Sequence, residues 1–285
     1  MRIYSSKGCP NRCGFCYNWA YHKSTWRGKS TDKLIEEIKY LVQNYKIKGV
    51  GFTDDLFTFD TERLVSFCDR LIEEKLNINW YCNARVGLDR PQLQKMKDAG
   101  CKCIYFGIES GSKNIHKLIN KGISIEKIHK TFDLCKQLGI STVGSFIIGF
   151  PDETEEDIRD TVNLAMALKP TIYDFSIYKC YPGTHLYDYS VKNGLFKQPA
   201  SMEDWIDISS WDKSAISFSK LSNNELEVLC DFFTFKTIMN SAVHDTNTII
   251  GYINLRKVVE VFTEVSRIVL NIMKSRKVLK KYSLI

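Results

Sequence analysis

Three cysteines stand close together near the start of the chain, in the stretch "GCPNRCGFC". They are Cys9, Cys13 and Cys16, with the spacing C-x3-C-x2-C. Thiolates at such short intervals are typical ligands of zinc or of an iron–sulfur cluster. A metal centre held by protein alone usually needs four ligands, and this stretch offers three. The group that takes the fourth position therefore decides the chemistry.

Two kinds of metal centre fit the stretch. A structural zinc site takes four nitrogen or sulfur ligands, and His22 could complete the set. Zinc cysteines usually come as close pairs, however, and a second pair is missing here. In a 4Fe–4S cluster, three thiolates leave one iron open, which is what a catalytic metal needs. Gly8, Pro10 and Gly14 would let the backbone wrap such a cluster. We favour a cluster with an open iron, and a non-catalytic zinc or iron–sulfur module is the alternative.

Alternating strand-like and helix-like segments follow this stretch and must position it. The strand-like segments are 2–7, 48–55, 78–85, 101–110, 141–150 and 172–181. Helical periodicity covers 31–45, 61–75, 124–138 and 153–168, and a further helix starts at Asp89 and ends before Gly100. Such alternation predicts an α/β fold with parallel strands. Six units are too few for a closed eight-stranded barrel, so we expect a partial (β/α)6 TIM-like barrel. A doubly wound sheet is the competing arrangement.

Each predicted strand ends in polar or Gly/Pro-rich residues. The six ends read "GCPNRC", "TDD", "NAR", "ESGS", "GFPDET" and "YPGT". In parallel α/β folds, ligands bind at the carboxyl ends of the strands. The sequence therefore predicts that the six ends surround one ligand-binding mouth.

The alternation stops after about residue 190. We therefore expect a barrel domain over 1–190, and a lid with a helical extension over 191–285. The stretch 195–220 has no clear period and could cover the mouth. Two helices should follow, one starting with a Ser222–Glu225 capping box and one over 257–279.

The overall composition is that of an ordinary globular protein. The chain has 285 residues, of which 44% are hydrophobic and 26% are charged. No run of about 18 uncharged apolar residues occurs, so we expect no transmembrane segment. The start "MRIYSSKGC" leaves no room for a signal peptide, which predicts a cytoplasmic protein. The net charge is +7, much of it near the C-terminus, where we expect a solvated basic helix end.

The chain has ten cysteines, and their distribution argues against a disulfide framework. They are not evenly paired in loops. Those outside the first stretch are expected to be buried small hydrophobes. Cys180 stands beside the predicted mouth and is also a candidate for a further ligand.

The pattern C-x3-C-x-aromatic-C after the first strand resembles the radical S-adenosylmethionine (SAM) superfamily. Phe15 is the aromatic residue. Further segments are similar to its cobalamin-binding branch and come in the same order. They are "WRGKS", "FTDDLFT", "MKDAGCKCIYFGIESGS", "KG", "FIIGFPDET" and "YPGT". The resemblance covers residues 1–190 well and the remainder only loosely.

The resemblance implies a function for the first stretch. Cys9, Cys13 and Cys16 would hold a 4Fe–4S cluster, and the amino and carboxylate groups of SAM would chelate the fourth iron. An electron passed to SAM would release methionine and a 5′-deoxyadenosyl radical, which takes a hydrogen atom from the substrate. The resemblance thus implies an enzyme with a small-molecule substrate and a low-potential electron donor such as a flavodoxin or ferredoxin.

The resemblance also implies roles for residues at the other strand ends. The backbone around Thr53, Asp54 and Asp55 would meet the SAM amino group, where many members have Gly-Gly-Glu. Arg85 would pair with the SAM carboxylate. Glu109 and Ser110 would accept hydrogen bonds from the ribose or the amino group. The residues expected near adenine are Phe15, Gly149, Pro151, Tyr181 and Gly183. Two plainer readings stay open, in which the paired acids are a solvated helix cap and Arg85 is a surface arginine.

The cobalamin-binding branch carries a cobalamin domain before the barrel, whereas here the cysteines start at residue 9. A D-x-H-x-x-G signature for the corrin is also missing. We therefore expect cobalamin to take part only if an upstream domain or a partner supplies it. Methylation, cyclisation and other C–H functionalisation stay open, and no RNA-binding domain is evident, so a nucleic-acid substrate is not expected.

Overall fold

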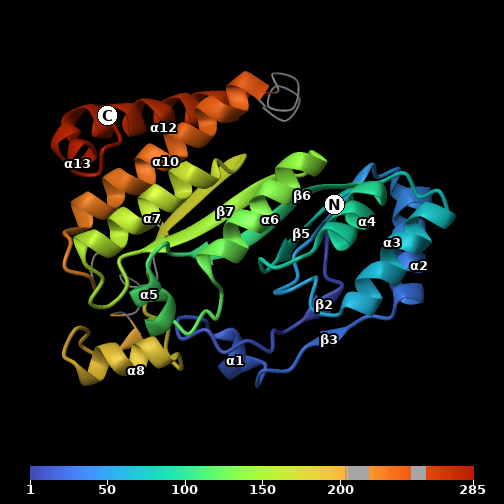
Figure 1. The fold of residues 1–285 in the computed structure, drawn as a ribbon, viewed down its shortest axis with the longest axis horizontal. Coiled ribbons are helices and arrows are strands. Elements are labelled where there is room, and N and C mark those ends of the chain that lie inside the picture. Colours follow the sequence, from blue (N-terminus) through green and yellow to red (C-terminus); the bar gives the residue numbers. More distant parts are fainter. Residues whose placement is uncertain (203, 205–217, 245–254) are drawn as a thin grey trace. The chain divides into compact units, whose positions relative to one another are not determined.

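The fold described here comes from a computed structural model, which describes residues 1–202, 204, 218–244 and 255–285. Most of the predicted lid over 195–220 lies outside the described residues. Six strands form one parallel sheet (Figure 1). In sheet order they are β1 (Arg2–Ile3), β4 (Gly49–Phe52), β5 (Asn79–Ala84), β6 (Cys101–Glu109), β7 (Ser141–Ile148) and β8 (Ile172–Ile177). The chain thus has the predicted α/β fold of a partial TIM-like barrel.

The first predicted strand, over residues 2–7, is wrong as a single element. It divides into β1 and β2 (Ser6–Lys7), and β2 pairs antiparallel with β3 (Arg27–Gly28) outside the main sheet. Ser5 separates the two because its backbone N–H donates to Asp54 Oδ1 at 2.7 Å instead of to a neighbouring strand. The chain therefore leaves the main sheet after Ile3, six positions before Cys9.

The helices between the strands begin at side-chain caps. They are α2 (Thr31–Tyr45), α3 (Thr61–Glu73), α4 (Arg90–Asp98), α6 (Ile125–Leu138) and α7 (Glu155–Leu168). The capping side chains are Ser30, Asp60, Asp89, Ser124 and Thr154, and each accepts a hydrogen bond from the N–H three residues on. Such caps satisfy backbone donors that the first turn leaves unpaired. The predicted helices are confirmed to within two residues at each end.

The chain divides into two compact units. The first contains residues 1–108, 116–144 and 181–185. In it α2 packs against α3, α3 against α4 and α4 against α6 (Figure 1). Its core includes four aromatic rings within 6 Å of one another, those of Phe52, Phe57, Phe67 and Trp80. Two short helices, α1 (Asn18–Tyr21) and α5 (Lys113–Leu118), were not predicted.

The second unit contains residues 109–115, 145–180 and 186–285. Helix α8 (His185–Lys192) follows β8, and α10 (Asn223–His244) packs against β8 through Phe233, which stacks on Phe175 at 3.9 Å between ring centres. The predicted capping box is confirmed, since Glu225 Oε2 accepts from Ser222 N and Glu225 N donates to Ser222 Oγ.

The last predicted helix, over 257–279, is two helices. They are α12 (Leu255–Lys274) and α13 (Arg276–Lys281), separated by Ser275, whose backbone is not helical. Part of the positive charge near the C-terminus is neutralised within the protein, because Lys281 forms ion pairs with Glu155 at 2.9 Å and with Glu225 at 2.8 Å. No helix in the described ranges has the length and apolar character needed to span a bilayer.

Candidate active site

The loop that carries the three cysteines, Gly8–Cys16, is called the cluster loop below. Gly8 has a φ of 86°, and a side-chain carbon added there would lie 2.0 Å from the carbonyl oxygen of Thr25. Only glycine fits this entry to the loop. Gly14 N–H donates to the carbonyl of Ile119 at 2.7 Å, and Asn120 Nδ2 donates to the carbonyl of Arg12 at 3.1 Å. The segment after α5 therefore fixes the second half of the cluster loop.

The three thiols differ in burial and in their partners. Cys13 is buried, and Arg85 Nη1 donates to its Sγ at 3.7 Å. Cys9 and Cys16 are half-buried, and Asn11 Nδ2 donates to Cys9 Sγ at 3.2 Å. Burial raises the pKa of Cys16 to about 11, and the neighbouring thiols add to the rise. Across the described ranges, no three His, Cys, Asp or Glu side chains converge on a point that could hold one metal ion.

The chemistry of this donor set fits an anionic cluster held by thiolates. The three thiols belong to one loop, and Cys9 and Cys13 are close enough to Cys16 to raise its pKa. Positive charge and N–H donors lie beside them, from Arg85, from Asn11 and from Lys121, whose charge lowers the pKa of Cys16 against the effect of burial. Such groups stabilise negative charge on sulfur and tune a cluster's potential.

The acids after β4 use their side chains to hold the approach to the cluster loop. Asp54 is completely buried, and its carboxylate accepts from Ser5 N, Ser5 Oγ and Ser6 Oγ at 2.5 to 2.7 Å. Asp55 is exposed, and its Oδ2 accepts from Gly8 N at 2.7 Å. The cap of the next helix is Asp60, so the reading of the paired acids as that cap is wrong. Thr53 N and Oγ1 both donate to the carbonyl of Ile3.

Arg85 is not a free surface arginine. It is half-buried at the end of β5, where Nη1 reaches Cys13 and Nη2 donates to the carbonyl of Lys121. Lys121 is 7% exposed, and its Nζ lies 5.9 Å from the ring centre of Phe15. Arg85, Lys121 and Phe15 therefore form one group around the cluster loop.

Tyr181 and Gly183 form a turn that also belongs to the first unit. The carbonyl of Tyr181 accepts from Thr184 Oγ1 at 2.7 Å, and Gly183 has a φ of 77°. Tyr181 is 41% exposed. His185, just after the turn, stacks on Trp19 at 4.4 Å. The turn thus lies near the C-terminal side of the cluster loop.

Four predicted site residues, Glu109, Ser110, Gly149 and Pro151, lie in the second unit. Glu109 is buried at the end of β6 with a φ of 70°, a backbone conformation that costs energy for a residue with a side chain. Strain of this kind is concentrated at functional sites. The Ser110 hydroxyl is within 2.8 Å of Thr161 Oγ1 and accepts from Ser112 N at 3.1 Å. Gly149 has a φ of 87°, and an added side-chain carbon would lie 2.9 Å from Leu226.

Glu153 is a residue of this second group that the sequence reasoning missed. It is completely buried, and its Oε2 accepts from the backbone N–H groups of Gly149 at 2.5 Å and Phe150 at 3.1 Å. Burial raises the pKa of Glu153 to about 8. The signal in the sequence that could have identified Glu153 is its position, four residues after Gly149 and directly before Thr154, the capping residue of α7. The carboxyl of Glu153 fixes the turn that presents the Gly149 backbone.

The remaining candidates have ordinary surroundings. Cys180 is 2% exposed, and His22 Nδ1 faces Arg27 Nη2 at 3.2 Å. The remaining cysteines outside the cluster loop are buried or half-buried. Glu109, Ser110, Gly149, Pro151 and Cys180 belong to the second unit and the other predicted site residues to the first, so the single mouth stays a prediction.

Comparison with known proteins places these residues in a family. The model of the Radical SAM superfamily matches residues 3–165. An uncharacterised methyltransferase of Pyrococcus horikoshii is 39% identical over 194 residues, which are 68% of this chain and 42% of that protein. The anaerobic magnesium-protoporphyrin IX monomethyl ester cyclase of Rubrivivax gelatinosus is 28% identical over 185 residues, or 64% of this chain and 33% of that protein. The chain thus spans less than half the length of these relatives.

A solved structure shows the same fold. It is the radical S-adenosylmethionine methyltransferase TsrM of Kitasatospora setae with cobalamin and a [4Fe-4S] cluster bound, which matches with a TM-score of 0.62 at 20% identity. The match covers 67% of this chain and 39% of that one. The family model covers more than half of the present sequence. The chain therefore belongs to the radical SAM superfamily.

Proposed function

We propose that Cys9, Cys13 and Cys16 bind a 4Fe–4S cluster and that the chain uses it to cleave SAM. The observation that carries the proposal is the cluster loop itself, which has three thiols with a cation and an amide donor beside them. Such a cluster, when bound, supplies one electron to SAM, giving methionine and a 5′-deoxyadenosyl radical for hydrogen abstraction. The protein has to bind and orient the reactants and exclude competing reactions.

In the first unit, the surroundings of the cluster loop support these tasks. Arg85 would offset negative charge at Cys13 and bind the SAM carboxylate. Asp54 and Asp55 would hold the loop's approach through their side chains, and the backbone around 53–55 is proposed to meet the SAM amino group. Phe15, Tyr181 and Gly183 are proposed to border the adenine.

In the second unit, two turns are proposed to contact the nucleoside part of SAM. Glu109 would accept from the ribose or the amino group, and its strained backbone supports a functional role. Ser110 would act from the same strand end. Gly149 would present its backbone to adenine, on a turn that Glu153 fixes.

The reaction on the substrate is proposed to be a C–H functionalisation of a small molecule, with methylation or cyclisation as its leading forms. The support is that the relatives are named as a methyltransferase and a cyclase. Cobalamin would enter only through an upstream domain or a partner. A flavodoxin- or ferredoxin-like donor would supply the electron. We further propose that the barrel part extends over 1–190, that 191–285 covers and extends it, and that the protein works in the cytoplasm.

The test is metal analysis followed by a cleavage assay under anaerobic conditions. The protein should bind about four irons and four sulfides, and with SAM and dithionite it should release 5′-deoxyadenosine. One zinc and no sulfide would end the proposal in favour of the zinc module. An intact cluster with no release of 5′-deoxyadenosine would leave a non-catalytic iron–sulfur module.

Two alanine variants assign the cluster to the cluster loop. Cys13→Ala should lose both the iron and the cleavage activity. Cys103→Ala, which removes a half-buried thiol on β6, should keep both. Equal iron in the two variants would contradict the ligand assignment.

A further inference from the structure

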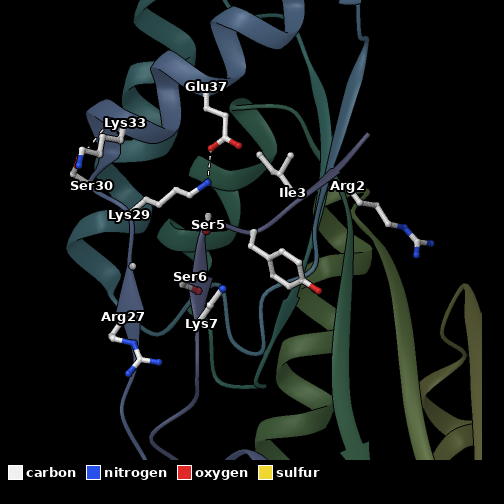
Figure 2. Close-up of a pocket in the computed structure, with 12 residues that line it drawn as sticks. Arg2, Ile3, Ser5, Ser6, Lys7, Arg27, Lys29, Ser30, Lys33 and Glu37 are labelled. Carbon is white, nitrogen blue, oxygen red and sulfur yellow. Dashed lines mark hydrogen bonds and ion pairs between the residues drawn. The ribbon is translucent and has the colours of Figure 1, made fainter. Parts of the chain in front are cut away.

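A cavity lies in the first unit beside the start of the chain. Its volume is about 750 Å³, and it is bounded by residues of β1, β2 and β3 and by the beginning of α2 (Figure 2). Small-molecule sites have volumes of roughly 300–1,000 Å³. None of the residues proposed to bind the cluster or SAM lines this cavity. It is therefore a candidate for a second binding site.

The cavity is strongly positive. Its charged lining residues are Arg2, Lys7, Arg27, Lys29, Lys33 and Glu37, a formal charge of +4. Glu37 is already paired with Lys29 at 2.5 Å. Within the part of the chain that the structure describes, the other four cations form no ion pair, and Arg2 and Arg27 only reach Tyr81 and His22. Like charges gathered around a hollow favour an anionic ligand.

The wall of the cavity is fixed before any ligand arrives. Lys29 N–H donates to the carbonyl of Ser5 at 2.8 Å, which joins the segments on either side of the cavity. Behind them, Arg63 donates from Nη2 to the carbonyl of Ser5 at 3.1 Å and from Nε to that of Lys29 at 2.9 Å. Asp54 binds the hydroxyls of Ser5 and Ser6. A preformed wall lowers the ordering cost of binding.

The distribution of the cations indicates the kind of anion. Figure 2 shows Arg2 and Arg27 on opposite sides of the view and Lys33 apart from both, so the cationic groups do not point at one centre. A single small ion would meet only one or two of them. A phosphate group carries a charge of about −1.5 to −2 at neutral pH, so two groups match the charge of the lining. Arginine and lysine are both established phosphate-binding side chains.

We propose that this cavity binds a small organic molecule that carries two phosphate groups. The lining surrounds one open hollow, whereas nucleic acid would need an extended basic track with stacking platforms, and this favours a small molecule. A ligand bound in the cavity would affect the cluster loop. Lys7 lines the cavity and is followed directly by Gly8, the first residue of that loop, whose N–H donates to Asp55. The lining residues of the cavity are different from those proposed to bind the cluster and SAM.

Calorimetric titration of the full, anaerobically purified protein tests the proposal. The probes are fructose 1,6-bisphosphate and 2,3-bisphosphoglycerate, whose phosphates are far apart and close together, with fructose 6-phosphate and fructose as comparators. We expect one site, at least about tenfold tighter binding of a bisphosphate than of the monophosphate, and no binding of fructose. The affinity should fall as salt is added. The absence of saturable binding by both bisphosphates would overturn the proposal.

Variants locate the site. Arg27→Gln and Lys33→Gln should each weaken bisphosphate binding about tenfold, because each removes a charge-assisted contact. Lys130→Gln is the matched control, since Lys130 is exposed on α6 and does not line the cavity. Equal weakening by Lys130→Gln would show unspecific charge attraction and reject the site. Tighter binding of a short single-stranded RNA, weakened by Arg27→Gln, would reject the small-molecule proposal in favour of nucleic acid. Circular dichroism confirms that each variant is folded.

Discussion

Two polar regions of the molecule are built in opposite ways. The cluster loop keeps binding capacity available, since Cys9 and Cys16 are half-buried. Within the residues that the structure describes, one side-chain hydrogen bond reaches Cys9 and one reaches Cys13. The second region, called the α7 network here, uses its polar groups on one another and on nearby backbone N–H groups. Its members are Ser110, Ser112, Glu153, Asp157 and Thr161, all at most 6% exposed. The difference suggests that the first region receives ligands and the second holds backbone in shape.

Arg85→Met has the largest expected effect and tests whether the surroundings of the cluster loop bind ligands. It removes the charge beside Cys13 and the proposed partner of the SAM carboxylate, so we expect SAM cleavage to fall about a hundredfold with a raised KM for SAM. Unfolding by urea should change little. Arg276→Met is the control, because Arg276 is exposed on α13. If Arg85→Met lowered stability but left the KM for SAM unchanged, Arg85 would have a structural role, like the α7 network, and no role in binding SAM.

Glu153→Ala tests the structural role of the α7 network. The variant leaves the N–H groups of Gly149 and Phe150 without their acceptor, and each unpaired buried donor is costly. We expect a loss of about 2–3 kcal/mol in the free energy of unfolding, measured with urea. Iron content should stay normal. Loss of the cluster in a folded Glu153→Ala protein would mean that the two regions are not functionally separate.

The sequence predicted the cluster loop and most of the fold because these depend on local patterns. Three cysteines in one loop and the cap-and-period signals of α2 at 31–45 can be found without tertiary structure. The division at Ser5 could not be found, because it depends on Asp54, which is 49 residues away. Asn120 and Lys121 contact the cluster loop from more than 100 residues downstream. Glu153 was missed because the sequence alone does not distinguish an acid that is buried in a turn from one that is exposed to solvent.

The pH dependence of stability sharpens the comparison through Glu153. Burial raises its pKa to about 8, above the value of 4.5 in an unfolded chain. Between these values the folded protein holds a proton that the unfolded chain loses, so this group makes stability fall as pH rises, by up to about 1.4 kcal/mol per pH unit. Glu153→Gln should remove this fall. If the difference in unfolding free energy between wild type and Glu153→Gln stayed constant from pH 5 to pH 8, Glu153 would be ionised in the fold.

Ser112→Ala should have the smallest effect, and its pH dependence should have the opposite sign. Burial would raise the pKa of Asp157, but hydrogen bonds, above all from Ser112 Oγ at 2.5 Å, outweigh it and hold the pKa below its usual value. The contribution of Asp157 is therefore present at neutral pH and lost as pH falls through the folded pKa. We expect Ser112→Ala to cost about 1 kcal/mol at pH 7 and less in acid, measured by urea unfolding. A cost that grew in acid would contradict the assignment. The two acids therefore change stability with opposite signs and in different pH windows, Asp157 below its ordinary pKa of 3.8 and Glu153 between 4.5 and about 8.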